Sequence, residues 1–458
     1  MVDGVYDSNQ IPASELPHHE LRSLESYPLY RTSSIDELGE VPVHWEVRRL
    51  KYLATVNEET LAETTDPNLE IAYVDIGNVD SVEGITGRED VVFEDAPSRA
   101  RRIVRQGDVI ISTVRTYLRA IARIEAADAN VIVSTGFAVV RPRHLNDGFM
   151  AYALRAPYFV ERVVANSVGV SYPAINASEL ACLDIAIPPL VEQRAIAAFL
   201  DRETAKIDSL VAKKERLVEL LQEKRAALTS RAVTKGLDPA APMKDSGVEW
   251  LGEIPAHWEV RRLKSISEIR YGLGQPPRES VDGLPLIRAT NVSSGHITDV
   301  GMVFIDPLDV PAGRRAFLSA HEIIVVRSGA YTADSSIVPG RYEGAVAGYD
   351  MVVTVRSANP EFLATALLCP YVRDAQLVVA STRSAQPHLN AEELGEALIL
   401  LPPLSEQQSI AGFLSSETSK LDALIVKVRE AIEHLKELRA ALISAAVTGR
   451  IDVREEAA

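Results

Sequence analysis

The sequence is short of cysteine and of long apolar runs, and each shortage excludes a class of protein. Cys182 and Cys369 are the only cysteines in 458 residues, and they lie in unrelated surroundings. Neither a disulfide framework nor a cysteine-based metal centre is therefore predicted, and we expect two buried thiols. No stretch approaches the roughly 18 apolar residues of a membrane span, and the opening MVDGVYDSNQ lacks the basic and apolar regions of a signal peptide. We expect a cytoplasmic protein without membrane contact.

Positive charge is scarce as well. The net charge of −16 argues against a protein that coats nucleic acid through bulk electrostatics, because that mode of binding needs an excess of Lys and Arg to displace counterions. One window reverses the balance, since between residues 99 and 123 Asp108 is the only acid. The arginines of this window are Arg99, Arg101, Arg102, Arg105, Arg115, Arg119 and Arg123. This window can face phosphate.

Catalytic motifs are missing too. The GLG at 272–274 is followed by Gln-Pro-Pro, which cannot open the helix of a dinucleotide-binding fingerprint. GVSYP at 169–173 lacks the closing glycine of a nucleophile elbow. There is no P-loop and no HExxH, and neither the Asn/Asp-Pro-Pro-aromatic motif nor the Gly-rich loop of a methyltransferase is found. We therefore expect no catalytic residues, no metal and no cofactor in this chain.

What the sequence does contain is an internal repeat. GEVPVHWEVRRLK at 39–51 and GEIPAHWEVRRLK at 252–264 share 11 of 13 residues at an offset of 213. Residues 188–208 and 402–422, both beginning PPL, share 13 of 21 at an offset of 214, and RAALTSRAVT at 225–234 matches RAALISAAVT at 439–448. The chain thus consists of two similar halves, each a globular segment followed by a helical one.

Between these motifs the halves diverge but keep a common frame. Asn78 aligns with Asn291, and Asn176 aligns with Asn390. Both globular segments contain short apolar runs bounded by turn residues, such as 109–113, 131–135, 322–326 and 351–355. We predict an α+β fold in which each half has a curled, mostly antiparallel sheet. A common framework with different loops is expected of two domains that each recognise a different half of one DNA site.

The helical segments carry heptads, which predict two long helices that pair as an antiparallel coiled coil with pseudo-twofold symmetry. Each begins after a Pro-Pro pair, and Gly236 and Gly449 end them. From Leu200 to Leu228 the coil measures about 42 Å, roughly 12 base pairs of DNA. Lys214 and Lys224 interrupt the first seam. The expected apolar seam residues are Leu200, Ile207, Leu210, Leu217, Leu221, Leu228, Leu414, Leu421, Leu424, Val428, Leu435, Leu438 and Leu442.

The order of globular half, PPLxEQ-led helix, GExPxHWEVRRLK linker and second half resembles the specificity subunits of type I restriction-modification systems, over residues 33 to 453. The resemblance implies two target-recognition domains that read a bipartite, asymmetric site on double-stranded DNA, and helices that set the spacer. It also implies two methyltransferase subunits, which bind S-adenosylmethionine, and restriction (translocase/nuclease) subunits, which use ATP and Mg²⁺. The implied divisions are an acidic extension (1–32), domain 1 (33–187), helical spacer 1 (188–236), a linker (237–256), domain 2 (257–401) and helical spacer 2 (402–458).

Residues 1–32 fall outside the repeat, and we expect a flexible tail there. The repeated His44-Trp45 and His257-Trp258 are interpreted as structural, with Trp seating the linker. Asn176 and Asn390 are interpreted as turn formers.

Candidates for DNA contact are polar and aromatic residues of the unlike loops, because Arg can bond guanine and Gln adenine in a bidentate manner. They are Asn78, Arg101, Arg105, Arg115, Tyr117, Arg119, Ser171 and Tyr172 in the first half, and Asn291, Arg327, Ser328, Tyr331, Thr332, Arg383, Ser384 and Gln386 in the second. Two alternatives stay open: a stand-alone DNA-binding regulator or architectural protein, and an enzyme acting on DNA.

Overall fold

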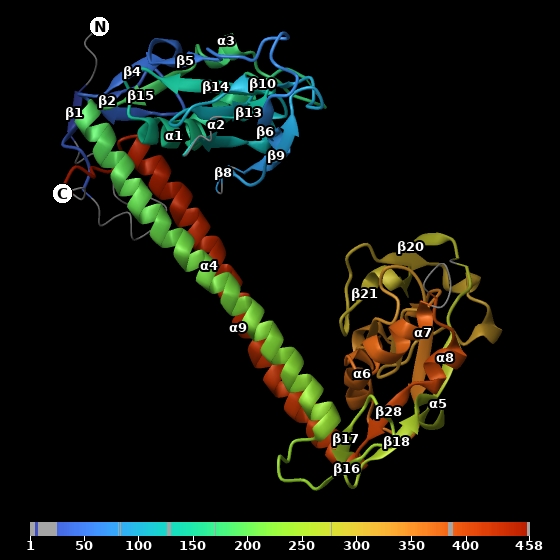
Figure 1. The fold of residues 1–458 in the computed structure, drawn as a ribbon. Helices are drawn as coiled ribbons and strands as arrows, with labels where there is room; N and C mark the ends of the chain where they lie inside the picture. Colours follow the sequence, from blue (N-terminus) through green and yellow to red (C-terminus); the bar gives the residue numbers. More distant parts are fainter. Residues whose placement is uncertain are drawn as a thin grey trace. The chain divides into compact units, whose positions relative to one another are not determined.

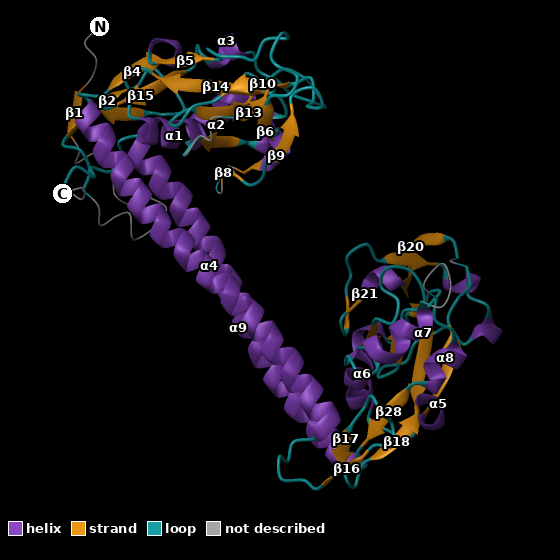
Figure 2. Ribbon diagram, in the orientation of Figure 1, coloured by secondary structure: helices purple, strands orange, loops and turns teal. Residues whose placement is uncertain are grey.

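A computed structural model describes residues 5–7, 25–80, 82, 84–125, 130–169, 171–275, 277–382 and 388–455. The chain forms two compact units. Unit 1 comprises Met1–Glu215 and Glu430–Ala458, and unit 2 comprises Arg216–Arg429. Each unit contains one globular domain and a part of both long helices (Figures 1 and 2).

Two four-stranded sheets dominate unit 1. The first is antiparallel throughout, in the order β12 (Ile121–Arg123), β11 (Val109–Ser112), β14 (Phe137–Pro142) and β5 (Ala54–Val56). The second has the order β10 (Ala100–Ile103), β13 (Val131–Ser134), β6 (Glu70–Val74) and β9 (Glu89–Val92), with β13 and β6 parallel. Smaller pairings join β1 (Val5–Asp7), β2 (Leu29–Thr32) and β3 (Glu40–Pro42), β4 (Glu46–Arg49) with β15 (Asp184–Ile187), and β7 (Val79–Asp80) with β8 (Gly84–Ile85).

The central strand β11 is buried on both faces, which explains its uninterrupted run of apolar residues. Val109 and Ile111 pack in the core that contains Phe149 and Phe159, from helices α1 (Asp147–Arg155) and α2 (Pro157–Ala165). Ile110 points the other way, into a core shared with β6 and β13. Since successive side chains of a strand alternate between faces, helices cover one side of this sheet and the second sheet covers the other.

Unit 2 repeats this plan, with a four-stranded main sheet but three strands in place of four in the second sheet. Its main sheet has the order β25 (Ser335–Ile337), β24 (Ile323–Val325), β27 (Met351–Val355) and β19 (Ser267–Tyr271), all antiparallel. A second sheet joins β23 (Val303–Ile305), β20 (Glu279–Ile287) and β26 (Val346–Ala347), with β20 and β26 parallel. The α+β fold and the internal repeat are thus confirmed, with a parallel strand pair in each unit.

The smaller elements follow the same correspondence. In unit 2 they are β16 (Met243–Asp245) with β17 (Glu253–Pro255), β18 (Glu259–Arg262) with β28 (Leu398–Leu401), and β21 (Val292–Ser293) with β22 (His296–Ile297). Its short helices are α5 (Leu263–Ile266), α6 (Pro360–Leu368), a π-helical turn (Arg373–Val378) leading into α7 (Val379–Ser381), and α8 (Ala391–Glu396), which corresponds to α3 (Ala177–Leu180) of unit 1.

The repeat begins earlier than sequence identity indicates, because the hairpin β2–β3 matches β16–β17. In both hairpins a serine amide donates to a glycine carbonyl, Ser33 to Gly39 at 2.7 Å and Ser246 to Gly252 at 3.0 Å. Tyr27 and Tyr30 are buried, and the Tyr30 hydroxyl donates to the Gly449 carbonyl at 2.9 Å. The expectation of a flexible tail is therefore wrong for residues 25–32, which close the core of unit 1. The rest of the 1–32 extension, apart from β1, lies outside the described residues.

The long helices begin and end as the sequence predicts. Helix α4 (Leu190–Lys235) follows Pro188-Pro189, and α9 (Leu404–Val447) follows Pro402-Pro403. Gly236 and Gly449 both have a φ of 73°, the left-handed conformation that commonly terminates a helix.

Ion pairs show that the two helices run antiparallel. In unit 1 Arg439 Nε lies 2.9 Å from Asp208 Oδ1, and in unit 2 Arg225 Nε lies 3.1 Å from Asp422 Oδ1. A later position on α4 meets an earlier one on α9, so the antiparallel coiled coil is confirmed. The two pairs are also repeat counterparts at the offset of 214.

One of the two predicted core positions of the coil is right, and the other is right only at Leu438. Leu200, Ile207, Leu221, Leu414, Leu421, Val428 and Leu442 are buried, and Leu228, Leu435 and Leu438 are partly buried. Leu210, Leu217 and Leu424 are instead 46%, 40% and 43% exposed. The positions that pack are one residue further on, namely Val211, Val218, Ile425 and Ile432. Lys214 is half-buried at the seam, whereas Lys224 is exposed and Arg225 takes the half-buried position.

Both repeated motifs have a structural use, as we expected for His and Trp. Trp45 Nε1 donates to Glu192 of the PPLxEQ motif at 2.7 Å, and Trp258 Nε1 donates to Glu406 at 3.1 Å. His44 and His257 contact the same carboxylates at 2.9 and 2.7 Å. The glutamines of the PPLxEQ motif connect the helix to the domain. The side-chain oxygens of Gln193 and Gln407 accept hydrogen bonds from the backbone amides of Asn146 and Asn359. The linker motif and the helix start therefore form one joint, which occurs in both units.

Two further findings concern burial. Cys369 is buried, and burial raises the pKa of its thiol to about 12. Cys182 is exposed, so the expectation of two buried thiols is wrong for Cys182.

Within the described part of the chain, no single helix has the length and apolarity of a membrane span. Only the bent pair Pro360–Leu368 and Arg373–Ser381, which meet at 59°, passes that test together, and Phe362, Leu363 and Leu367 of this pair are buried.

Candidate nucleic-acid interface

In unit 1 the loop between β11 and β12 lies against the loop before α3. The Thr116 hydroxyl donates to the Ser167 hydroxyl at 2.8 Å, and the Ile175 amide donates to the Thr113 carbonyl at 2.9 Å. Val114 and Ala174 form an isolated β-bridge. These contacts join residues 113–119 with residues 167–169 and 171–175, which are far from them in sequence, into one surface.

This junction brings five of the predicted residues together. Arg115 lies 5.0 Å over the ring of Tyr172, and Tyr117 and Tyr172 are 53% and 65% exposed. Arg119 and Ser171 are also exposed. An arginine stacked on an exposed ring, beside a second exposed tyrosine, offers hydrogen-bond donors and flat apolar faces together, as base-reading surfaces do.

Unit 2 builds the corresponding loop, 327–333, with the same main-chain bonds. Val326 donates to the Asp334 carbonyl at 2.8 Å, as Ser112 does to Ala120 at 2.9 Å. Leu389 donates to Arg327 at 2.8 Å, as Ile175 does to Thr113. The bridge between Ser328 and His388 matches the bridge between Val114 and Ala174. Since every pair is related by an offset of 214, Tyr331 is the counterpart of Tyr117, and it is 48% exposed.

The side chains of the second loop differ from those of the first. Arg327 lies 4.6 Å from the Tyr271 ring and 4.3 Å from the Tyr349 ring, and its Nη2 is 2.7 Å from His388 Nε2. Asp350 accepts the Arg327 amide at 3.2 Å, and burial raises the pKa of this carboxyl to about 6. The arginine is therefore held in one orientation.

Sequence reasoning missed Tyr271, Tyr349 and His388. The only signal was a tyrosine beside a glycine, Tyr271-Gly272 and Gly348-Tyr349, at the ends of two strand-like runs. Pairing of β19 with β27, which the sequence does not specify, brings the two tyrosines to the same arginine.

Several predicted contact residues serve the fold instead. Asn291 is fully buried, and its amide donates to the carbonyls of Thr298 and Val300 at 3.3 and 3.1 Å. It therefore has no surface to offer DNA. Asn78 is half-buried, and its carbonyl accepts the Thr86 amide at 2.8 Å. Thr332 is 9% exposed and donates to the Gly329 carbonyl at 2.7 Å, which supports the turn.

The two asparagines of the shared frame are helix caps. Asn390 accepts the Glu393 amide at 2.9 Å, and Glu393 in return accepts the Asn390 amide at 3.0 Å. Asn176 and Glu179 form the same capping box at the start of α3. The predicted side-chain to backbone bonds of these asparagines are confirmed, but they cap helix starts rather than form turns.

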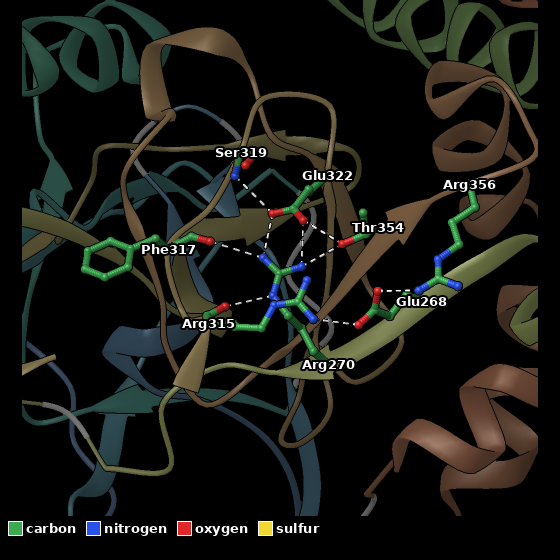
Figure 3. Close-up of polar contacts among 8 residues, drawn as sticks. All are labelled: Glu268, Arg270, Arg315, Phe317, Ser319, Glu322, Thr354 and Arg356. Atoms are coloured by element: carbon green, nitrogen blue, oxygen red, sulfur yellow. Dashed lines mark hydrogen bonds and ion pairs between the residues drawn. The ribbon is translucent and has the colours of Figure 1, made fainter. Parts of the chain in front are cut away.

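Many arginines of both domains have partners within their own domain. Arg105 pairs with Glu59, and Arg101 lies 4.5 Å over the Phe93 ring. In unit 2 Arg270 Nη2 donates to Glu322 at 2.6 Å (Figure 3). Burial opposes ionisation of Glu322, but hydrogen bonds from Arg270 and Thr354 outweigh it and lower the pKa of this carboxyl. Arginines of this kind hold strands together.

Arg115 and Arg119 are both exposed, and no ion pair connects either of them to a carboxylate in the parts of unit 1 that the structure describes. Their charge is free for a ligand. Arg383, Ser384 and Gln386, the remaining predicted residues, lie outside the described residues.

Comparisons with known proteins agree with this architecture. The model of the type I restriction modification DNA specificity domain matches residues 42–219 and again residues 255–434. The chain is 24% identical over 322 residues to the type I restriction enzyme EcoKI specificity subunit of Escherichia coli strain K12, covering 68% of each protein. It is 24% identical over 441 residues to the putative type I restriction enzyme MjaX specificity subunit of Methanocaldococcus jannaschii, covering 91% of this chain and 96% of the relative.

Solved structures share the fold. One chain, from work on the assembly and conformational transition of the type I R-M system, superposes with a TM-score of 0.72 at 22% identity, covering 89% of this chain and 98% of the other. The HsdS subunit from Thermoanaerobacter tengcongensis superposes with a TM-score of 0.54 at 22% identity, covering 90% and 98%. None of these comparisons supports a stand-alone regulator. With the family model matching both halves, the chain belongs to the type I restriction-modification DNA specificity family and is a subunit that gives such a system its DNA sequence specificity.

Proposed function

We propose that each unit reads one part of a bipartite, asymmetric DNA site, through the loop 113–119 of unit 1 and the loop 327–333 of unit 2. The observation that carries this proposal is that the two loops share their main-chain hydrogen bonds but present unlike side chains. A shared frame suits two domains that meet the same double helix, and unlike side chains suit two different base sequences.

Individual residues fit distinct roles. Arg115 and Arg327, both stacked on tyrosine rings, suit bidentate contacts to guanine. Tyr117 and Tyr331 suit edge or phosphate contacts, as do Arg119, Ser171 and Ser328. Gln386 suits adenine, and Arg383 and Ser384 suit phosphate or base edges. Arg105 suits phosphate, because its side chain is 63% exposed despite the pair with Glu59. Arg101 suits phosphate as well, because its guanidinium stacks on the Phe93 ring and leaves its charge available.

The chain is proposed to act without catalysis of its own, in the cytoplasm, by directing other subunits to the site. Its relatives are named as specificity subunits of restriction enzymes, which supports partner subunits in a restriction-modification complex. We propose that these partners are two methyltransferase subunits, which bind S-adenosylmethionine, and restriction subunits, which use ATP and Mg²⁺. The net charge of −16 supports partners that supply most of the non-specific DNA affinity. Leu217, Leu220 and Leu424 are 40–45% exposed on the helices and offer apolar surface to such partners.

A domain exchange tests the proposal. Residues 44–187 are replaced by the first recognition domain of another family member, and methylated positions are mapped in DNA from cells that carry the system. We expect a new sequence in one half-site and an unchanged sequence in the other. Exchange of 257–401 is the matched control and should change only the other half-site. If either exchange altered both half-sites, the modular assignment would be wrong.

A further inference from the structure

Two arginines of the loop 113–119 have left-handed backbone conformations. Arg115 and Arg119 both have a φ of 52°, on either side of the 3₁₀ turn Thr116–Leu118. Their repeat counterparts are Gly329, with a φ of 87°, and Ala333, with a φ of 69°. Glycine adopts this conformation without a steric penalty, whereas a residue with a Cβ atom is strained in it. For stability alone, glycine would suit position 115 better than arginine.

No ion pair within the described residues explains why an arginine occupies position 115, since its one ring contact is with an exposed tyrosine. Its guanidinium lies over the ring of that residue, Tyr172. Arg315 offers a useful contrast, because it also has a positive φ, 49°, but pairs with Glu268 at 2.8 Å (Figure 3). The strain at Arg315 positions an internal ion pair. The strain at Arg115 positions a free guanidinium on an exposed ring.

We propose that Arg115 is a specificity-determining residue of the first domain and binds the O6 and N7 edge of a guanine in the first half-site. This inference rests on the proposed function. A phosphate contact needs only a positive charge. A lysine, or an arginine on an unstrained backbone, would also provide that charge. The planar fork of arginine, fixed by a stacked ring and a strained backbone, matches the two acceptors of guanine in the major groove. Strained residues persist where the side chain that they aim has a function.

The test uses the full chain co-purified with its methyltransferase and a pool of random-sequence DNA duplexes, from which bound sequences are selected and sequenced. The variants are Arg115→Gly, Arg115→Ala and Arg115→Lys, with Arg315→Gly as the control for replacing an arginine of positive φ. We expect Arg115→Gly and Arg115→Ala to lose the preference for G·C at one position of the first half-site, and Arg115→Lys to weaken it. Affinity for the wild-type site should fall by about 10- to 100-fold. The second half-site should be unchanged, and Arg315→Gly should select the wild-type motif.

Thermal unfolding separates strain from simple loss of a side chain. Arg115→Gly should have a Tm equal to or above that of the wild type and above that of Arg115→Ala, because only glycine relieves the strained backbone. A lower Tm for Arg115→Gly than for Arg115→Ala would overturn the strain argument. An unchanged motif in Arg115→Ala, with weaker binding to every sequence, would overturn base reading in favour of a phosphate contact. If the wild type itself selected no bipartite motif, the proposed function would fail; if it did and Arg115→Gly selected the same motif, only this inference would fail.

Discussion

At the residue scale the two units solve the same problem with different side chains. An acid stands just before the central strand in both, Asp108 before β11 and Glu322 before β24, at the offset of 214. In unit 1 Arg141 of β14 binds Asp108 at 2.8 Å, whereas in unit 2 Arg270 of β19 binds Glu322 at 2.6 Å. A buried carboxylate needs a charged partner, and the arginine comes from the adjacent strand β14 in unit 1 but from β19, on the far side of β27, in unit 2. The repeat therefore preserves the ion pair but not the strand that donates the arginine.

The joint between linker and helix is more deeply buried in unit 1. Glu192 is 5% exposed and accepts bonds from His44, Trp45 and Tyr27, while the Glu406 side chain is 28% exposed and binds His257 and Trp258. Burial and the bond to Glu192 raise the pKa of Tyr27, so this phenol stays protonated and donates. The carboxylate of the PPLxEQ motif is therefore expected to contribute more to the stability of unit 1 than to that of unit 2.

We therefore expect Glu192→Ala to lower the free energy of unfolding of unit 1 by about 3 kcal/mol, because two buried donors, Trp45 and Tyr27, lose a charged acceptor. Glu406→Ala is the matched control and should cost less, since water reaches that site. Urea unfolding followed by tryptophan fluorescence and circular dichroism measures both. Equal costs, or a larger cost for Glu406→Ala, would contradict the proposed difference in burial.

Asp350 gives a pH-dependent prediction. Its pKa is raised from an ordinary value of 3.8 to about 6, chiefly by burial, so the folded state holds this proton more tightly than the unfolded chain. The contribution of this residue to stability is therefore largest below pH 4 and is lost as pH rises through 6, by on the order of 2–3 kcal/mol. Asp350→Asn should remove that slope. The measurement is the difference in unfolding free energy between wild type and variant from pH 4 to pH 7, and a constant difference would disprove the assignment.

At the element scale the coiled coil shows where a periodic pattern is ambiguous. Leucines at 210 and 217 and valines at 211 and 218 each recur every seven residues, and either set can follow the position of Ile207. A spacing of 3.5 residues allows a step of three or of four, so the sequence alone does not select the face. The partner helix selects it, since Val218 packs with Leu221, Leu421 and Ile425 in unit 2.

This seam predicts a large loss of stability for one substitution and almost none for a substitution at the adjacent residue. Val218→Asp should lower the free energy of unfolding by about 2 kcal/mol or more, because a charge would replace an apolar side chain in the seam. Leu217→Asp should change it by less than about 0.5 kcal/mol, as is usual for exposed positions. Thermal unfolding monitored at 222 nm compares the two variants. A destabilised Leu217→Asp with an unaffected Val218→Asp would restore the seam that the sequence first indicated.

At the scale of the whole molecule, the repeat makes the two ends of the coil equivalent. The second helix ends at the Trp45 joint of unit 1, where the Gly449 carbonyl accepts the Tyr30 hydroxyl. The first helix ends at the Trp258 joint of unit 2, where Gly236 lies beside the Trp258 ring and Glu406. Each domain is therefore attached to the start of its own helix and to the end of the other.

If the helices set the DNA spacer, lengthening both should lengthen the spacer alone. A seven-residue insertion in α4 after Leu217, with seven residues at the facing point of α9, keeps the seam in register and adds about 10 Å, or roughly three base pairs. We expect methylation mapping to show a longer gap between two unchanged half-sites. The matched control inserts seven glycine- and serine-rich residues into the linker at 237–242, which should leave the gap unchanged. A gap unaltered by the paired insertion would refute the role of the helices as a spacer.

The sequence by itself determined the duplication, the α+β class, the bounds of the two long helices and their antiparallel pairing. These features depend on local signals, namely repeated motifs, Pro-Pro helix starts, terminal glycines and runs of β-branched residues, each of which acts within a few residues. It also indicated the arginine and tyrosine loops, because their composition alone marks them.

Tertiary structure decided the face of the coil, the inclusion of residues 25–32 in the core and the partners of each arginine. It separated Asn291, which is buried and bonded to the backbone, from Arg115, which is strained and free. It also brought Tyr271 and Tyr349 to Arg327. These outcomes depend on strand pairing and helix packing between residues distant in sequence, and the same side chain is buried or exposed according to which neighbour the fold supplies.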